Sequence, residues 1–284
     1  MQHFNATKDE RYIELFADKP EMVIDFPEWL LSDRMIEECR AMPGLAIVEI
    51  AGRDSVAAAI KSVNEQSFTD LLPVYVYTGT EYGPWSSVEK AVERLASNLP
   101  MVRVHRLLVL GSPGFWKALN GRFVSQLIST YKFYTPCVAC HLYLHAVRIP
   151  LALNLGKVPI ISGEREQHDG VIKINQISAA LDFFIRLADK FEIQLLFPLR
   201  HISKGLLIED LLGFNWPEGK EQLECILSGN YRLSGKRLNI SASQVKGFLD
   251  EFAGPCTEKI VTSYVEGHIP DHLEIAAQIL ANRR

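Results

Sequence analysis

The sequence predicts an α/β fold in which helices cover both faces of a parallel β-sheet and a small helical region follows at the C-terminus. Between residues 44 and 200, short apolar runs alternate about five times with amphipathic segments, the order that produces a parallel sheet with crossover helices. Of the 284 residues, 48% are hydrophobic and 23% are charged, a balance that favours a globular protein over a disordered chain. After Arg200 the strand patterns fade and helical patterns continue.

The strands are predicted from short, mostly apolar runs. They cover residues 45–50, 72–77, 102–110, 158–161 and 193–197. The helices are predicted from apolar residues that recur on one helical face. They cover residues 21–42 (as one or two short helices), 55–66, 86–96, 115–132, a segment from about 137, and then 176–190, 202–213, 221–228 and 242–266. This order predicts an N-terminal helical extension (1–43), an α/β domain (44–205) and a C-terminal helical region (206–284).

Charge and cysteine content limit the function classes. Thirty basic and 34 acidic residues give a net charge of −4, so nucleic-acid binding would need a local basic patch. The N-terminus lacks the basic and apolar regions of a signal peptide, and the apolar runs fall short of the roughly 20 residues of a membrane span. Five cysteines are too few for a disulfide scaffold. These features predict a cytoplasmic protein without membrane contact, in which cysteines act as ligands or catalysts.

A turn of small and polar residues joins the first strand of the α/β domain to its helix. Residues 45–50 are mostly apolar, and apolar residues then recur on one face of residues 55–66. The turn between them reads Ala51-Gly52-Arg53-Asp54-Ser55. The backbone N–H groups and dipole of such a helix start bind phosphate. The other interpretation is an ordinary turn capped by Asp54 or Ser55.

Two cysteines stand at the start of a predicted helix, in the sequence Thr135-Pro136-Cys137-Val138-Ala139-Cys140-His141. Thr135 suits the N-cap and Pro136 the first helical position. Cys137 and Cys140 would then face the same way in the first turns, where the helix dipole lowers the pKa of a thiol. Such a pair predicts a soft-metal or redox site, and an inert pair is the other interpretation.

Polar residues follow the predicted strand at residues 158–161. They include Gly163, Glu164, Arg165, His168 and Lys173. Ligands of parallel sheets collect at the C-terminal ends of strands, and carboxylates there could hold Mg²⁺ against a triphosphate. A solvated loop is the other interpretation. A second basic group, Arg200, His201 and Lys204, follows the last strand and is either a phosphate site or a surface cap.

Together these segments resemble the PP-loop ATP pyrophosphatase superfamily, whose signature is a strand, Ser-Gly-Gly-x-Asp-Ser and a helix. Residues 50–55 keep the second glycine, the aspartate and the final serine, but lack the leading serine and carry alanine for the first glycine. The tRNA 2-thiolation branch also carries Cys-x-x-Cys on the helix after its third strand and a third cysteine beyond a Pro-Leu step. Cys137 and Cys140 resemble that pair, and Cys225, 85 residues after Cys140, resembles the third cysteine.

The resemblance implies a Rossmann-like sheet that binds ATP and Mg²⁺, with the nucleotide held by Ala51, Gly52, Arg53, Asp54, Ser55, Gly163 and Lys173. It implies that Asp54, Glu164, Arg165 and His168 serve catalysis. It further implies a [4Fe–4S] cluster on Cys137, Cys140 and Cys225, with one iron open to sulfur. The enzyme would adenylate a carbonyl oxygen of tRNA or of a small molecule, release pyrophosphate, and let sulfur from a donor displace AMP.

Two departures from the branch accompany the match. The family's Gly-His-x-x-Asp-Asp loop is replaced by residues 163–169, and the zinc ribbons of some thiolation enzymes are absent. One alternative is therefore a nucleotide-binding or sensing module without turnover, in which Zn²⁺ is held by Cys137, Cys140, Cys225 and Cys256. Another is an amide-forming PP-loop enzyme that uses ammonia or an amine. Assembly as a homodimer stays open.

Overall fold

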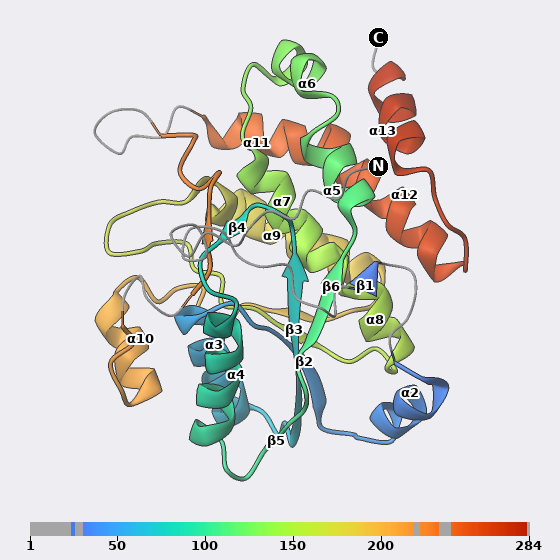
Figure 1. The fold of residues 1–284 in the computed structure, drawn as a ribbon. Helices are drawn as coiled ribbons and strands as arrows, with labels where there is room; N and C mark the ends of the chain where they lie inside the picture. The colour runs from blue at the N-terminus through green and yellow to red at the C-terminus, as the bar shows by residue number, and fades with distance from the viewer. Residues whose placement is uncertain (1–23, 26–30, 218–221, 233–239, 283–284) are drawn as a thin grey trace, which may run out of the picture.

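A parallel sheet forms the centre of the computed structural model, which describes residues 24–25, 31–217, 222–232 and 240–282 (Figure 1). Within this part of the chain, seven strands form the sheet in the order β1-β6-β3-β2-β7-β8, with β5 paired to β3. Their bounds are β1 Ile24–Asp25, β2 Leu45–Glu49, β3 Asp70–Tyr77, β5 Arg103–Val104, β6 Leu108–Gly111, β7 Ile160–Ile161 and β8 Leu195–Leu196. The predicted α/β fold class is confirmed. If β2, β3, β6, β7 and β8 are numbered 1 to 5 in chain order, they lie side by side in the sheet in the order 3-2-1-4-5.

Helices cover both faces of the sheet, because alternate strand residues point to two separate cores. Ile47, Val74 and Leu110 belong to one core, whereas Val48 and Tyr75 belong to the other. Period-two alternation with both faces apolar is the pattern of a parallel sheet buried on each side. The second core contains residues of α3 (Arg53–Glu65), α4 (Ser86–Asn98) and α10 (Gly205–Leu212).

The first core contains residues of most of the remaining helices. These are α2 Asp33–Arg40, α5 Pro113–Asn120, α6 Val124–Tyr131, α7 Pro136–Ala146, α8 Ile149–Asn154, α9 Ser178–Lys190, α11 Ala242–Phe248, α12 Gly254–Val265 and α13 His272–Ala281. A π-helical turn, Leu249–Ala253, joins α11 to α12, and a 3₁₀ turn, Ile174–Gln176, precedes α9. The C-terminal helices therefore share a core with the α/β part, and the division at residue 206 stays a prediction.

Several predicted elements differ from the structure. The strand predicted at 102–110 is two strands, β5 and β6, and the helix predicted at 115–132 is two helices separated after Gly121, a poor helix former. Part of the predicted N-terminal helical extension is a strand, because β1 pairs with the sheet edge at β6. The rest of that extension, apart from α2, lies outside the described residues or in short connections.

The helix predicted at 221–228 is wrong for the residues that the structure describes there. Glu224–Cys225 forms β9, which pairs antiparallel with β4 (Glu81–Tyr82). Cross-strand pairing with a distant segment outweighs the local helical pattern in this stretch. The pairing places Cys225 opposite Glu81, which is decisive for the site described below.

One helical stretch of the described chain, Pro136–Asn154, is long and apolar enough to cross a membrane by length and composition. It is longer than the apolar runs considered from sequence because α7 and α8 follow one another directly. Inside the structure 72% of its apolar window is buried. The burial is that of a core helix, since α7 packs against α5, α9 and α12.

Candidate functional site

The loops that follow β2 and β7 meet at the C-terminal edge of the sheet. The connection from β2 leads to β3 on one side of the sheet, and the connection from β7 leads to β8 on the other side. Open α/β sheets bind ligands in the crevice between two connections that diverge in this way. A cavity of about 560 Å³ lies there, and we call it the loop cavity. It is lined by Ala51, Gly52, Arg53, Asp54, Ser55, Gly163, Glu164, His168, Lys173 and Cys225 among others.

The turn at residues 51–55 is organised by Ser55. Its Oγ accepts hydrogen bonds from the N–H groups of Ala51 (2.9 Å) and Gly52 (3.0 Å) and donates to the Gly52 carbonyl (2.7 Å). The first α-helical bond of α3 runs from Val56 N to Gly52 O. The N–H groups of Asp54 and Ser55 precede this bond in the first turn of α3, and a helix start of this kind is the geometry that binds anions.

Gly163 lies against this turn. A Cβ atom placed on Gly163 would stand 2.6 Å from the carbonyl carbon of Asp54 and 2.6 Å from the amide nitrogen of Ser55. Only glycine lets the loop after β7 approach the turn after β2 so closely. The two predicted phosphate-binding segments are thus packed backbone to backbone.

Asp54 is held by two guanidinium groups. Arg53 Nε lies 2.9 Å from its Oδ1 and Arg165 Nε lies 2.8 Å from its Oδ2. Burial alone raises the pKa of Asp54, but Arg165 and Arg53 lower it below its usual value, so the carboxylate stays ionised. The side chain of Arg165, which the resemblance assigns to catalysis, is 1% exposed and is not among the residues that line the loop cavity. It positions Asp54 from behind.

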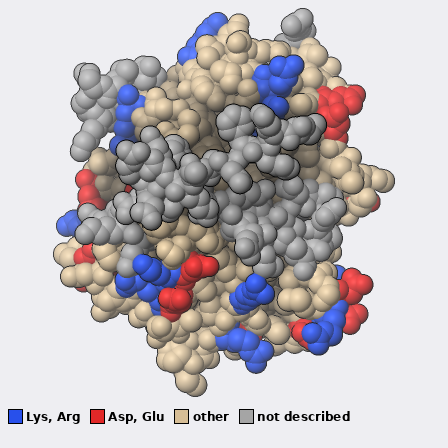
Figure 2. Space-filling model, viewed as in Figure 1, with Lys and Arg blue, Asp and Glu red and all other residues tan. Residues whose placement is uncertain are grey.

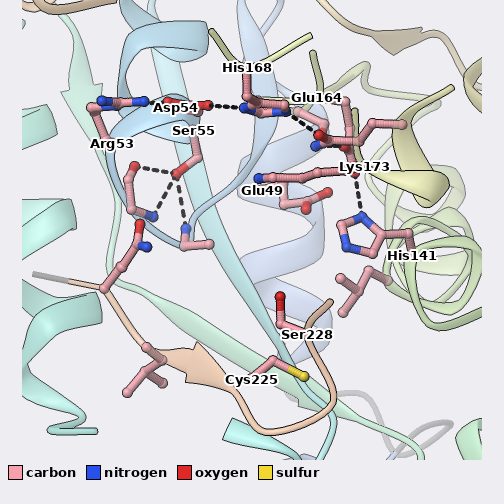
Figure 3. A pocket seen from close by; sticks show the side chains of 18 of the residues that line it. Glu49, Arg53, Asp54, Ser55, His141, Glu164, His168, Lys173, Cys225 and Ser228 are labelled. Carbon is pink, nitrogen blue, oxygen red and sulfur yellow. Dashed lines mark hydrogen bonds and ion pairs between the residues drawn. The ribbon is translucent and has the colours of Figure 1, made fainter. Parts of the chain in front are cut away.

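A chain of hydrogen bonds runs from Arg165 to His141. Arg165 Nη2 donates to His168 Nδ1 (2.9 Å), His168 Nε2 contacts the Gln176 carbonyl oxygen, and the Gln176 amide donates to Glu164. Glu164 in turn contacts His141 Nδ1 at 2.6 Å (Figure 3). Burial, with the charges of Lys173 and Arg165, lowers the pKa of His168 to about 4. Both ring nitrogens of this neutral histidine are bound by protein groups, which assigns it a positioning role.

Three buried charged residues near the site were not anticipated from the sequence. Glu49 ends β2 and lies 3.3 Å from Arg148 Nη1 and 3.2 Å from His145 Nδ1. Arg148 also donates to the Val74 carbonyl at 3.0 Å. His141, His145 and Arg148 follow one another at intervals of four and three residues on a helical segment, a spacing that places them on one face and could have revealed the group.

This cluster shifts the proton affinities of its members. Burial opposes the charge on Glu49, yet Arg148 and His145 lower its pKa to about 2. Burial likewise opposes the charge on His145, yet Glu49 and Glu164 raise its pKa to about 9. At neutral pH the cluster therefore contains ionised carboxylates, a guanidinium and an imidazolium, a set whose attraction compensates for the desolvation of each group.

We expect the protein to become less stable as the pH rises, because of His145. A histidine whose pKa is raised on folding stabilises the native state fully below its unfolded pKa of about 6.5 and loses that contribution as the pH rises toward 9. The free energy of unfolding in urea should decrease by on the order of 2 kcal/mol between pH 6.5 and 8 through this group. The variant His145→Gln should show a flatter profile over that interval, and an equal slope in both proteins would contradict the assignment.

Three of the predicted cysteines surround a second cavity of about 490 Å³, which we call the thiol cavity. Cys137 and Cys140 come from the first turns of α7, where the Thr135 side chain caps the helix at Cys137 N. Cys225 comes from β9, and its Sγ lies 3.2 Å from Thr80 Oγ1. Trp116 Nε1 donates to Cys140 Sγ at 3.3 Å. All three are free thiols.

The expected effect of the helix dipole on these thiols is wrong for the protein without a metal. Burial raises the pKa of Cys137 and of Cys140 above the ordinary value, because the low-dielectric surroundings disfavour a thiolate. A bound metal would reverse this, since a coordinating thiol loses its proton. The fourth candidate ligand, Cys256, lies on α12, is fully buried in the first core and lines neither cavity. The four-cysteine zinc site is therefore not formed.

No group of three His, Cys, Asp or Glu side chains within the described ranges is arranged to hold a metal ion. Cys137, Cys140 and Cys225 are free thiols that line the same cavity. The predicted ligands Cys137, Cys140 and Cys225 are thus brought together by the fold.

The loop cavity and the thiol cavity adjoin. They share the lining residues His141, His168, Lys173, Cys225 and Ser228, and Figure 3 shows Cys225 and Ser228 on the wall opposite Glu164 and His141. The turn after β2 and the three thiols therefore border spaces that have a common wall. This continuity is the main chemical property of the site.

The comparisons with known proteins give one relative by sequence. The uncharacterized protein MJ0009 from Methanocaldococcus jannaschii is 34% identical over 281 residues, which cover 94% of this chain and 100% of the relative. No family model matches the chain. Among solved structures, the U34-tRNA thiolase NcsA from Methanococcus maripaludis with its [4Fe-4S] cluster matches 87% of this chain and 77% of its own, at 14% identity and a TM-score of 0.37. At that TM-score the likeness carries no argument.

Proposed function

The chain belongs to the family of the uncharacterized protein MJ0009, and we propose that it is a PP-loop-type enzyme that adenylates a substrate with ATP and then transfers sulfur to it. The observation that carries this proposal is the junction of the two cavities. The phosphate-binding turn at residues 51–55 and the three cysteines are far apart in sequence, yet they line adjoining spaces at the sheet edge.

The loop cavity supplies what a nucleoside triphosphate requires. The N–H groups at the start of α3 would bind phosphate oxygens, and Lys173, on the wall shared with the thiol cavity, would add a positive charge. Arg53 and Asp54 belong to the turn and are paired with each other, and Asp54 would orient Mg²⁺ or the turn itself. Glu164, buried and linked to His141, keeps the opposite wall polar.

The proposed reaction has two steps. A carbonyl oxygen of the substrate attacks the α-phosphorus of ATP, the bond to the β-phosphate oxygen breaks, and pyrophosphate leaves with the electron pair. This exchange gives the carbonyl carbon a good leaving group, AMP, which a sulfur nucleophile then displaces. A [4Fe–4S] cluster held by Cys137, Cys140 and Cys225 would supply an iron with an open position for sulfur.

The acceptor is proposed to be a tRNA or a small molecule with such a carbonyl. The protein is proposed to act in the cytoplasm. Basic and acidic side chains intermingle on the face of the molecule drawn in Figure 2, so surface charge gives no separate support for an extended polyanion there. The charges that matter for the acceptor are those inside the cavities.

The proposal predicts the composition and the ATP chemistry of the purified protein. After anaerobic purification we expect close to four irons and four sulfides per chain and a broad absorption near ~400 nm. With MgATP and an acceptor preparation such as bulk tRNA, we expect AMP and pyrophosphate as products. A colourless protein with one tightly bound zinc would contradict sulfur transfer, and pyrophosphate release by an iron-free protein would favour amide formation.

A further inference from the structure

Residues that line the thiol cavity carry hydrogen-bond donors that have no acceptor within the described part of the chain. Asn175 is 4% exposed, and its Nδ2 has no hydrogen-bond partner. Arg232 Nε is likewise buried without a partner. The side chain of Lys173 forms no hydrogen bond or ion pair with the described residues, and burial lowers its pKa while Asp54 and Glu164 oppose that shift. All three side chains line the thiol cavity, and a buried donor without an acceptor costs free energy.

These donors belong to one wall. Arg232 Nη2 donates to the carbonyl of Ile172 at 3.3 Å, beside Lys173 in the chain. The Arg232 guanidinium also lies 5.5 Å from the centre of the Tyr231 ring, which restricts its orientation. Asn175 lies two residues after Lys173 in the 3₁₀ turn before α9. The fold therefore places a guanidinium, an amide and an ammonium group on the same side of the cavity.

The nearby carboxylates are already bound by other groups. Asp54 is paired with Arg53 and Arg165, and Glu164 is bound by His141 and Gln176. Neither is therefore available as a full counter-ion for the donor wall. Both carboxylates attract the charge of Lys173, but no ion pair joins either of them to the wall within the described residues, so an anionic ligand would add the direct partner.

The shape of the donor set indicates its ligand. A guanidinium offers two parallel N–H groups to a carboxylate or a phosphate, and the ammonium group of Lys173 adds a second positive charge on the cavity wall. A neutral, donor-bearing ligand would leave these groups unpaired. A ligand with several acceptor oxygens and a negative charge would satisfy them together.

We propose that the wall formed by Lys173, Asn175 and Arg232 binds an oxyanion group of the acceptor substrate, a carboxylate or a phosphate, on the thiol side of the site. The inference rests on the proposed function in calling this ligand the acceptor. It narrows that function, since the substrate must carry an anionic group within reach of the carbonyl that is activated. The oxyanion site is separate from the phosphate-binding turn. Of its three residues, only Lys173 also lines the loop cavity that contains that turn.

The test measures binding of simple oxyanions to the full chain. Inorganic phosphate is titrated and followed by ³¹P line broadening, and acetate is titrated in parallel by calorimetry, which distinguishes the two sources of the anion. We expect one of them to bind the native protein, and Arg232→Gln and Asn175→Asp to weaken that binding about 10- to 100-fold. Asn175→Asp keeps the side-chain volume and replaces the donor by a repelling carboxylate.

The control variant is Arg103→Gln, which removes a cation that is 68% exposed at the other end of the sheet, beside Asp70, and should leave oxyanion binding unchanged. MgATP affinity should change less than threefold in Arg232→Gln. The proposal is overturned if neither oxyanion binds, if both cavity variants bind as the native protein does, or if MgATP displaces the oxyanion competitively. If the oxyanion binds through Arg232 but MgATP does not bind at all, the proposed function fails and the oxyanion site remains.

Discussion

Replacing Gly163 with alanine is expected to weaken MgATP binding about 100-fold, because its Cβ has no space. The added atom would stand 2.6 Å from backbone atoms of both Asp54 and Ser55, and backbone cannot move aside as a flexible side chain can. The loop after β7 and the turn after β2 would have to separate, and losing one or two hydrogen bonds to a charged phosphate, at about 1.5–3 kcal/mol each, costs on the order of 100-fold in affinity. Calorimetric titration of MgATP measures the effect.

A matched glycine provides the control. Gly121 ends α5 with φ of −115°, and a Cβ there would meet its nearest neighbour at an ordinary 3.5 Å. Gly121→Ala should bind MgATP as the native protein does. Both variants should keep the native circular dichroism spectrum, which separates a local change at the site from loss of the fold. Native affinity in Gly163→Ala would show that the contact of the two loops is not part of the nucleotide site.

Replacing Cys225 with alanine is expected to remove the iron–sulfur cluster while leaving the fold intact. Cys225 is supplied by the β4–β9 pair and faces the cavity that Cys137 and Cys140 border, so its loss would leave two cysteine ligands where the cluster needs three. Iron should fall from about four per chain to less than about one, together with the absorption near ~400 nm. The measurement is metal analysis of anaerobically purified protein.

Cys256→Ala is the discriminating comparison. Cys256 is the other cysteine downstream of Cys140, but it is fully buried on α12 among apolar side chains. Its replacement should retain the full iron content and cost only a modest part of the stability, as expected for the loss of one small buried group. Iron lost from Cys256→Ala and kept in Cys225→Ala would reverse the ligand assignment and the proposed path for sulfur.

Local patterns were sufficient where the chemistry depends on neighbouring residues. The turn at 51–55 follows a buried strand and begins a helix, as its small residues predict. Thr135 caps α7 and Pro136 occupies its first turn, which places Cys137 and Cys140 as their spacing requires. These features depend on a few dihedral angles and on hydrogen bonds between residues close in the chain.

The roles of individual polar side chains were less predictable. Arg165 and His168 follow a strand end, as ligand-binding residues do, yet the structure uses them to hold Asp54 and Gln176. The sequence does not single out Glu49 at the end of an apolar strand, although it pairs with Arg148 in the buried ion cluster. Whether a charged side chain faces a ligand or another residue depends on partners from other segments, which a single stretch of sequence does not contain.

The sequence by itself determined the alternation of strands and helices, the phosphate-type turn and the paired cysteines, because each arises from interactions within one turn or one periodic segment. Only the tertiary structure decided that Cys225, and not Cys256, joins the pair, since that outcome depends on β9 pairing with β4 across more than a hundred residues. The adjoining cavities and the donor wall of the thiol cavity likewise exist only because the strand order 3-2-1-4-5 brings distant loops to one edge. Such contacts are selected by the packing of the whole chain, where many weak interactions together outweigh local preference.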